Sequence, residues 1–291
     1  MYRYLLVTGG AGFIGSHICR ALARVGVVPV VYDNLSTGHP DNVRWGPLVE
    51  GDLQDRRRLT TAIRKYRPQG VIHCAASAHV GESSAHPRKY DCSNVGGSLA
   101  LLETCLGEGL DRFVFSSRCA TYGIPAFLPI REEMAHVPID PYERTKLIFE
   151  SMLDDYVAAY GLRYVTLRYF NAADADPAEE LSEWHDAETH HICDLAQAHV
   201  SAIDYLLAGG TSLSLNLGSD QATSVREILG SIRHVTGKVV PLVFEKRRAD
   251  DPPLHFSDAR EARIRLGFAP LFSDIHTIIR MAPSFGFRLS S

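Results

Sequence analysis

Tyr142 and Lys146 are the side chains whose type and spacing could carry out acid–base chemistry. They stand four residues apart in the segment P-Y-E-R-T-K. A helix would place them on one face, with the ammonium group beside the phenol. That positive charge stabilises the phenolate, so Tyr142 could accept a proton and return it. The same spacing also occurs on solvated helix faces, so its meaning depends on the rest of the chain.

A glycine-rich turn with Gly9, Gly10, Gly12 and Gly15 predicts phosphate binding. The turn follows an apolar strand and opens a helix, an arrangement that directs backbone N–H groups and the positive end of the helix at an anion. Asp33 ends the next apolar run, about 20 residues further on, where an acid that binds both ribose hydroxyls is expected. Because an acid there repels a 2′-phosphate, the pattern favours NAD over NADP. The alternative is a turn used only for tight helix–strand packing.

Composition and charge narrow the function classes. The 291 residues are 45% hydrophobic and 22% charged, with a formal net charge of -4, which gives no electrostatic basis for binding nucleic acid or an anionic membrane. No apolar run reaches the length of a membrane span. The six cysteines form no C-x-x-C pair, so we expect reduced thiols. With no signal-peptide pattern at the N-terminus, we expect a cytoplasmic protein.

Alternating strand and helix patterns predict a doubly wound, Rossmann-type α/β fold with a parallel sheet. We expect strands at 3–8, 27–33, 48–50, 71–74 and 113–115, and helices at 12–25, 55–66, 90–109 and 141–160. Residues 1–170 would form an NAD-binding domain and residues 171–291 a smaller substrate region. In that region we expect helices at 194–207, 225–235, 260–266 and 275–281, and strands at 213–217 and 239–244.

Ligands of such a sheet lie beyond the carboxyl ends of its strands. Asp52 follows the third strand, where it could bond an adenine amino group or only cap the next helix. Ala75–Ala76 follows the fourth strand and is small enough for a cofactor to pass close to the backbone. Ser116, Ser117 and Arg118 follow the fifth strand, and we expect them to be exposed polar groups at the sheet edge.

Seven motifs spread over nearly the whole chain carry a family resemblance. They are V-T-G-G-A-G-F-I-G-S-H at 7–17, V-Y-D-N-L-S-T-G-H at 31–39, V-G-E-S at 80–83, F-S-S-R-C-A-T-Y-G at 115–123, P-Y-E-R-T-K at 141–146, L-R-Y-F-N-A-A at 167–173 and R-R-A-D-D-P-P at 247–253. With these motifs the chain resembles the UDP-glucose 4-epimerases of the extended short-chain dehydrogenase/reductase superfamily.

The resemblance implies NAD-dependent epimerisation of UDP-glucose and UDP-galactose at C4, through a transient 4-keto sugar. Tyr142 would take the proton of the 4-hydroxyl group while bound NAD accepts hydride. The implied cofactor-binding residues are Gly9, Gly12, Phe13, Ile14, Gly15, Asp33, Asn34, Asp52, Leu53, Cys74, Ala75, Ala76, Asn94, Ser116, Tyr142, Lys146 and Tyr169. Asn171 and Arg248 would hold the UDP phosphates and Asp251 its ribose, although Arg247-Arg248 could instead be a surface pair. Family members commonly pair through two helices, here near 90–109 and 141–160, which implies a homodimer.

Departures from the family pattern leave two alternatives open. Arg118 stands where the family has a catalytic Ser or Thr, and arginine cannot relay a proton because it only donates hydrogen bonds. Residues 188–190 run directly into 191–196, where the family has a few dozen more residues over the uracil and pyrophosphate. Glu143 replaces a usual Gly. One alternative is therefore a catalytically impaired or inactive NAD-binding relative. The other is a nucleotide-sugar dehydratase or reductase, although a dehydratase would need an acid beside the catalytic hydroxyl.

Four histidines invite the hypothesis of a metal site. His185, His190, His191 and His199 match no standard ligand spacing, and no cysteine joins them in a recognised pattern. We therefore expect no metal, with the histidines in loops and on helix surfaces.

Overall fold

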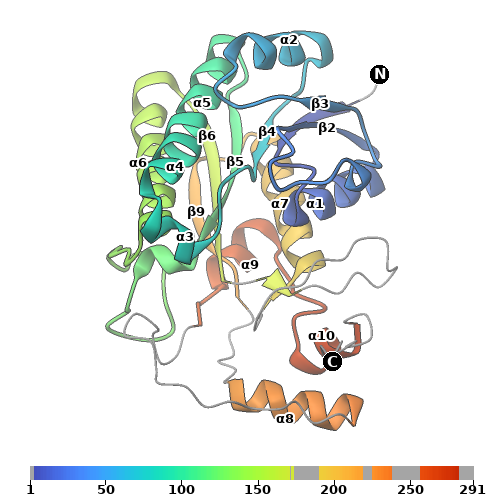
Figure 1. Cartoon of the computed structure of the whole chain (residues 1–291), viewed down its shortest axis with the longest axis vertical. Coiled ribbons are helices and arrows are strands. Elements are labelled where there is room, and N and C mark those ends of the chain that lie inside the picture. Colours follow the sequence, from blue (N-terminus) through green and yellow to red (C-terminus); the bar gives the residue numbers. More distant parts are fainter. Residues whose placement is uncertain (1–2, 171, 174–189, 219–224, 238–255, 282–291) are drawn as a thin grey trace.

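A computed structural model describes residues 3–170, 172–173, 190–218, 225–237 and 256–281. Its main sheet has seven parallel strands in the order β3-β2-β1-β4-β5-β6-β9 (Figure 1). The strands are β1 (Arg3–Thr8), β2 (Val27–Asp33), β3 (Leu48–Glu50), β4 (Val71–His73), β5 (Arg112–Arg118), β6 (Arg163–Tyr169) and β9 (Leu213–Asn216). The chain runs outward from β1 to β3 and then restarts at β4 beside β1. This is the doubly wound order, so the predicted fold class is confirmed.

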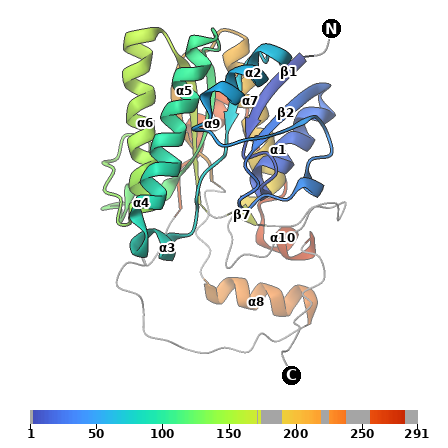
Figure 2. The same cartoon turned by 45° about the horizontal axis from the view of Figure 1, so that its top comes forward.

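Helices cover both faces of the sheet (Figure 2). One face packs against α1 (Phe13–Arg24), α7 (Ile192–Leu207) and α9 (Arg260–Leu266). The other packs against α2 (Arg56–Tyr66), α5 (Gly97–Gly107) and α6 (Pro141–Tyr160). The other described elements are η1 (Pro40–Asn42), α3 (Val80–Ala85), α4 (Pro87–Tyr90), η2 (Asp91–Gly96), η3 (Cys119–Tyr122), β7 (Ala172–Ala173), β8 (His190–His191), α8 (Val225–Thr236) and α10 (Ile275–Met281). None of the helices in the described part is long and apolar enough to cross a membrane.

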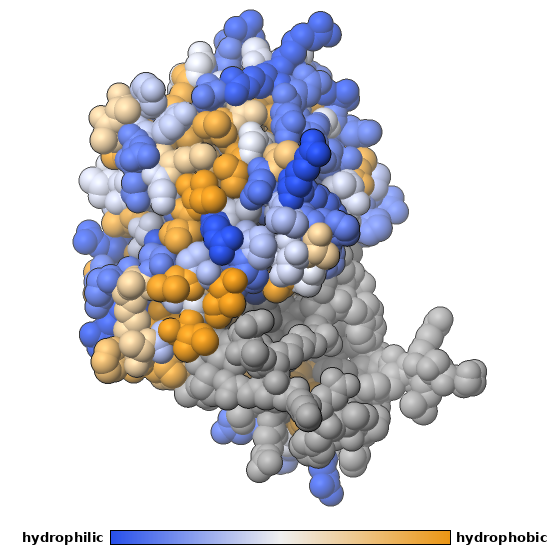
Figure 3. All heavy atoms as spheres, turned by 60° about the vertical axis from the view of Figure 1, so that its left-hand side comes forward, coloured by the Kyte–Doolittle hydropathy of each residue, from blue (hydrophilic) through white to orange (hydrophobic). Residues whose placement is uncertain are grey.

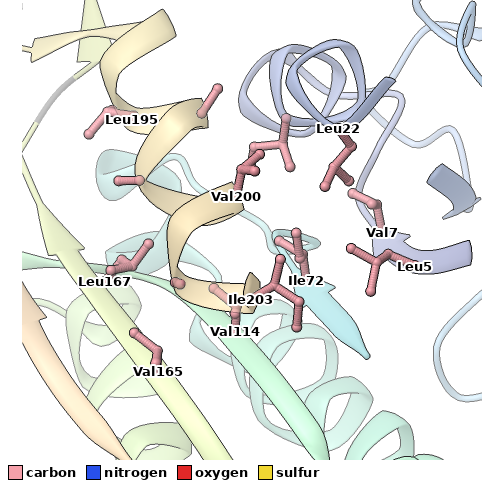
Figure 4. Close-up of a cluster of buried hydrophobic side chains, with 14 of the residues drawn as sticks. Leu5, Val7, Leu22, Ile72, Val114, Val165, Leu167, Leu195, Val200 and Ile203 are labelled. Carbon is pink, nitrogen blue, oxygen red and sulfur yellow. The ribbon is translucent and has the colours of Figure 1, made fainter. Parts of the chain in front are cut away.

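The alternation of side chains along the strands divides the hydrophobic core into two clusters, one on each face of the sheet. Along β1, Leu5 and Val7 belong to the buried cluster under α1 and α7, whereas Leu6 belongs to the cluster under α2 and α5. This follows because successive strand side chains point to opposite faces. Figure 4 shows the first cluster, in which Leu22 of α1 and Ile203 of α7 lie over the strands.

Helix α6 carries the candidate acid–base pair, and its ends are set by local sequence. The Asp140 side chain caps its N-terminus by accepting a hydrogen bond of 2.9 Å from the Glu143 N–H. Pro141 fits the first turn because no intrahelical partner exists there for an N–H group. Gly161 ends the helix with φ at 69°, a left-handed conformation that favours glycine.

Three features differ from the sequence-based expectation. The helix expected at 90–109 is interrupted by the π-helical turn η2 before α5 begins. β5 is longer than expected and continues through Arg118, because it pairs with β6 over seven residues. β9 lies beyond residue 170 but forms the edge of the main sheet, so the boundary that we expect between the NAD-binding domain and the substrate region falls within one sheet. The strand expected at 239–244 lies outside the described residues.

Candidate active site

The glycine turn between β1 and α1 is shaped by packing at two of its glycines. Gly9 has a φ of +71°, and a Cβ there would lie 2.6 Å from the Ala75 backbone nitrogen. A Cβ on Gly15 would lie 2.1 Å from the Gly9 carbonyl oxygen. Gly12 is different, because a Cβ there would meet only the Gly9 oxygen, at 3.4 Å. The protein itself does not require glycine at position 12, which fits a ligand that approaches the backbone on its open side.

The first turn of α1 is suited to an anion. The helix is preceded by Gly12, which supplies no side-chain cap, and begins with Phe13 and Ile14. Its N-terminal N–H groups therefore face the end of the sheet without a capping side chain, in the arrangement that binds phosphates. The residues present at this turn fit the pyrophosphate of a dinucleotide.

Two acids at the ends of β2 and β3 lie where a nucleoside would bind. The carboxylate of Asp33 accepts hydrogen bonds from the Ala11 N–H at 3.0 Å and the Leu35 N–H at 2.9 Å, which fix its orientation beside the glycine turn. The Asn34 amide donates to the Asp52 carboxylate at 3.0 Å. Helix α2 is capped by Asp55, whereas the Asp52 carboxylate accepts the Gln54 N–H at 2.9 Å in the preceding turn, so Asp52 is a turn acid but not the helix cap.

Asn94 in η2 connects two sides of the site. Its amide donates to the Ser77 carbonyl at 3.0 Å and to the Thr145 hydroxyl at 3.1 Å, and its oxygen accepts from the Ser77 N–H at 2.8 Å. The side chain thus ties the loop after β4 to α6. These contacts use both amide hydrogens within the protein, so Asn94 holds the wall of the expected cofactor site. The π-helical turn of η2 places this residue, and such turns often mark functional sites.

Smaller expected cofactor residues line the same edge of the sheet. Cys74 and Ala75–Ala76 come directly after β4, and the Cys74 N–H donates to the Thr8 carbonyl at 3.0 Å. Burial raises the pKa of the Cys74 thiol to about 12, so the thiol is neutral and acts as a small apolar group. Leu53 follows β3 and packs against the cluster under α2 and α5.

Tyr142 and Lys146 lie side by side on α6, as the helical spacing predicts, and they pack against the end of β5. Both are buried, with 4% and 5% of their surface exposed. The Lys146 ammonium group donates to the Ser116 carbonyl at 2.9 Å and lies 5.9 Å from the centre of the Tyr142 ring. The Tyr169 hydroxyl, at the end of β6, is hydrogen-bonded to the Ser116 hydroxyl. The site therefore places a tyrosine and a fixed cation side by side at the carboxyl end of the sheet.

The expected exposure of Ser116 and Ser117 is wrong. They are 4% and 0% exposed, because β5 continues past them and pairs with β6. Ser117 donates to the Glu150 carboxylate beneath the site.

Arg118 lies at the last position of β5, opposite Tyr169 of β6. Its guanidinium carbon is 5.7 Å from the centre of the Tyr142 ring. Burial alone would lower the pKa of Arg118, but Tyr142, Tyr169 and Glu143 outweigh that effect, so the pKa is raised. Arg118 is therefore a fixed cation on one side of Tyr142, with Lys146 also beside the ring.

A buried ionic network supports this edge and was missed by sequence reasoning. Glu150 and Arg168 are 4% and 6% exposed and form an ion pair of 2.6 Å. Arg168 also donates to the Tyr122 hydroxyl at 2.7 Å, which in turn donates to Asn216 of β9 at 3.0 Å. The sequence held one indication of this network, because Glu150 lies four residues after Lys146 and therefore on the same face of the helix.

Two of the four histidines lie within the helical layer, which corrects the expected surface positions. His191 and His199 are both 0% exposed. The His191 ring accepts from the Cys193 N–H at 3.1 Å as the cap of α7, and the His199 ring bonds the Leu195 carbonyl at 2.7 Å. Within the described residues, no group of three or more His, Cys, Asp or Glu could hold a metal ion. Asn171, Arg248 and Asp251, the expected nucleotide-sugar contacts, lie outside the described residues.

Known proteins are similar to this chain in sequence and in fold. A UDP-glucose 4-epimerase of Rhizobium leguminosarum bv. trifolii is 43% identical over 313 residues, which cover 96% of this chain and 95% of the relative. That alignment is longer than the chain, so some of its positions have no counterpart here. The crystal structure of UDP-glucose 4-epimerase from Brucella ovis in complex with NAD is 49% identical, with a TM-score of 0.92 and coverage of 96% and 97%.

A more distant solved structure and a family model agree with these relatives. The UDP-glucose 4-epimerase of Thermotoga maritima with UDP-glucose is 29% identical, with a TM-score of 0.85 and coverage of 96% and 97%. Residues 5–185 match the model of the NAD dependent epimerase/dehydratase family. Because this match spans more than half of the chain and the relatives are similar over nearly all of it, the chain belongs to the NAD dependent epimerase/dehydratase family.

Proposed function

We propose that this protein is an NAD-dependent UDP-glucose 4-epimerase, which interconverts UDP-glucose and UDP-galactose. The observation that carries the proposal is the position of Tyr142 and Lys146, buried together at the carboxyl end of the sheet. Relatives named UDP-glucose 4-epimerase, one with bound NAD and one with UDP-glucose, support this assignment.

The arrangement divides the work between cofactor and protein. Bound NAD supplies the group that accepts hydride from C4 and returns it, so the reaction has no net redox change. Tyr142 accepts the proton of the 4-hydroxyl group and gives it back when the sugar is reduced on the opposite face. Lys146, fixed by the Ser116 carbonyl, keeps positive charge beside the phenol during this transfer. Asp33, whose carboxylate is held by the Ala11 N–H, would orient the adenosine ribose of the cofactor.

The nucleotide part of the substrate is proposed to bind to the C-terminal region. Asn171 and Arg248 would contact the UDP phosphates and Asp251 the ribose, as their motifs suggest. Residues 171–291 contribute this substrate region, although β9 and α7 belong to the sheet and its covering layer. Binding of the remote nucleotide positions the hexose, so a shortened wall between 190 and 191 would weaken catalysis as well as affinity.

A homodimer is part of the proposal. Figure 3 shows apolar side chains gathered on the face that carries α5 and α6. On these helices Ile148 is 36% exposed, and Leu99, Leu106, Leu147 and Met152 are half-buried. Such a strip would be covered if two copies packed these helices together. Size-exclusion chromatography with light scattering tests this by giving twice the mass of 32.1 kDa or only that mass. All six cysteines are free thiols, which supports a cytoplasmic location.

A coupled assay tests the activity. Purified protein is supplied with UDP-galactose, and the UDP-glucose formed is oxidised by a separate dehydrogenase. Cofactor released from the denatured protein is measured in parallel. We expect steady turnover without added NAD to the epimerase and bound NAD in proportion to protein. Bound NAD without turnover would instead favour the inactive NAD-binding relative, and absence of both would refute the proposal.

A further inference from the structure

Arg118 occupies the position beside the catalytic phenol where the resemblance implies a hydroxyl group. It lies at the carboxyl end of β5, and its guanidinium carbon is 5.7 Å from the centre of the Tyr142 ring. Arginine carries five N–H donors and no acceptor, so one side chain could bind two oxygen atoms at once. A second oxygen near Tyr142 must be present during the reaction, because the phenol exchanges its proton with the sugar.

The surroundings of Arg118 are adapted to a permanent cation. Glu143, Tyr142 and Tyr169 come from α6 and β6, and each favours the charged guanidinium. Glu143 is itself a departure, since the family usually has Gly there. Its carboxylate also accepts the Ile139 N–H at 2.9 Å, which holds it at the start of α6. Two departures that lie together, an arginine and a glutamate, indicate one adapted unit rather than two separate losses.

We propose that Arg118 is a catalytic residue that donates N–H groups both to the Tyr142 oxygen and to the 4-oxygen of the hexose. This inference rests on the proposed epimerase function and deepens it. As the 4-hydroxyl group loses its proton to Tyr142 and C4 loses hydrogen with its electron pair to NAD, a C4=O double bond forms. Arg118 keeps its proton throughout and stabilises the negative charge that develops on the oxygen. The return step reverses each transfer.

This role differs from that of the hydroxyl it replaces. A hydroxyl group can accept and donate, so it can pass a proton between sugar and tyrosine, whereas a guanidinium group can only donate. The proton must therefore move directly between the 4-oxygen and Tyr142. Loss of such a donor should reduce the rate of the chemical step about 100-fold or more, while ground-state binding of the nucleotide is retained.

Three substitutions at one position test the proposal on protein with its bound NAD. For Arg118→Met we expect kcat to fall about 100-fold or more, with KM for UDP-galactose changed by less than about threefold. In Arg118→Gly, millimolar guanidinium ion should restore part of the lost turnover, but it should not do so in Arg118→Met, where the methionine fills the space. In Arg118→Thr turnover should stay below that of the unmodified protein, because Glu143 is left without its cation. Arg64→Met, at an exposed pair with Glu108, is the matched control and should retain turnover.

Two further readouts separate catalysis from structure. The content of bound NAD, and the affinity for UDP measured by calorimetry, should be unchanged in Arg118→Met. If Arg118→Met retains turnover, or if Arg118→Thr exceeds the unmodified protein, Arg118 is not catalytic and the proposal is wrong. If the unmodified protein binds NAD and UDP but has no turnover, the epimerase function fails first, and this proposal fails with it.

Discussion

Removal of the Arg168 guanidinium should expose how strongly the buried ionic network stabilises the site. In Arg168→Met, the Glu150 carboxylate loses donors at 2.6 Å and 3.0 Å, and the Tyr122 hydroxyl loses a donor at 2.7 Å. Glu150 would remain only 4% exposed, with the Ser117 hydroxyl still bonded to it. Breaking a buried ion pair by removing one partner costs about 3–5 kcal/mol, because a charge is left without compensation.

The same reasoning predicts that a second substitution restores stability. In the double variant Arg168→Met with Glu150→Gln, no net charge is buried, and the amide can still accept the Ser117 hydroxyl bond. The double variant should therefore recover most of the loss, with a coupling energy of about 2 kcal/mol or more between the two sites. Arg64→Met removes an exposed ion pair and serves as the control, for which little change is expected.

The assay is urea-induced unfolding followed by circular dichroism, on protein from which NAD has been removed so that cofactor binding does not add to stability. The free energy of unfolding is compared among the unmodified protein, both single variants, the double variant and Arg64→Met. A loss in Arg168→Met no larger than that of the control would refute the reasoning. So would a double variant that is less stable than Arg168→Met.

Four other predictions follow from the site. Tyr142→Phe should lower kcat about 100-fold or more while bound NAD stays constant, because only the proton acceptor is removed; a kcat within tenfold of the unmodified protein would contradict this. Gly12→Ala should leave thermal stability unchanged but weaken NAD binding. Gly15→Ala should destabilise the protein by about 1–3 kcal/mol or more, because its Cβ would lie 2.1 Å from the Gly9 oxygen. Equal effects of the two substitutions on stability would count against the role given to Gly12. Burial, together with the nearby Asp140, raises the pKa of Glu143 to about 7, so the contribution of Glu143 to stability is present at pH 4 and is lost as the pH rises to about 7. The free energy of unfolding of Glu143→Gln should therefore increase relative to that of the unmodified protein between pH 5 and pH 8. A difference between the two proteins that stays constant with pH would be contrary evidence. Burial, with Lys146 adding to the effect, lowers the pKa of His73 to about 3. The contribution of the neutral His73 ring to stability is therefore fully present above about pH 6.5 and is lost as the pH falls toward 3. Nuclear magnetic resonance should show a neutral His73 ring at pH 5, and a charged ring at that pH would disprove the prediction.

Patterns within short segments of the sequence predicted the strands, helix ends and side-chain pairs that depend on neighbouring residues alone. β1 and β2 end where their apolar runs end, and Asp55 caps α2 as its position before the helix suggests. Tyr142 and Lys146 were found because a four-residue spacing on one helix fixes their relation. The same applies to the glycine turn, in which spacing, strand and helix are read from one segment of sequence.

What the sequence did not predict depends on contacts between distant residues. Ser117 is buried because β5 continues along β6, where its partner in the sheet is Arg168, 51 residues further along the chain. The π-helical turn of η2 accompanies the bonds of Asn94 to the loop after β4 and to α6, and no local periodicity signals such bonds. The Glu150–Arg168 pair joins a helix to the following strand, so neither charge alone indicated its partner.

Proton nuclear magnetic resonance of the conversion in D2O tests the central claim most directly. Protein with its bound NAD is given UDP-galactose and no other cofactor, and the C4 hydrogen of the UDP-glucose is observed. Since Tyr142 exchanges only the hydroxyl proton and bound NAD returns the hydrogen taken from C4, we predict UDP-glucose with no deuterium at C4. Conversion with deuterium at C4, or no conversion by protein that contains NAD and binds UDP, would contradict the account.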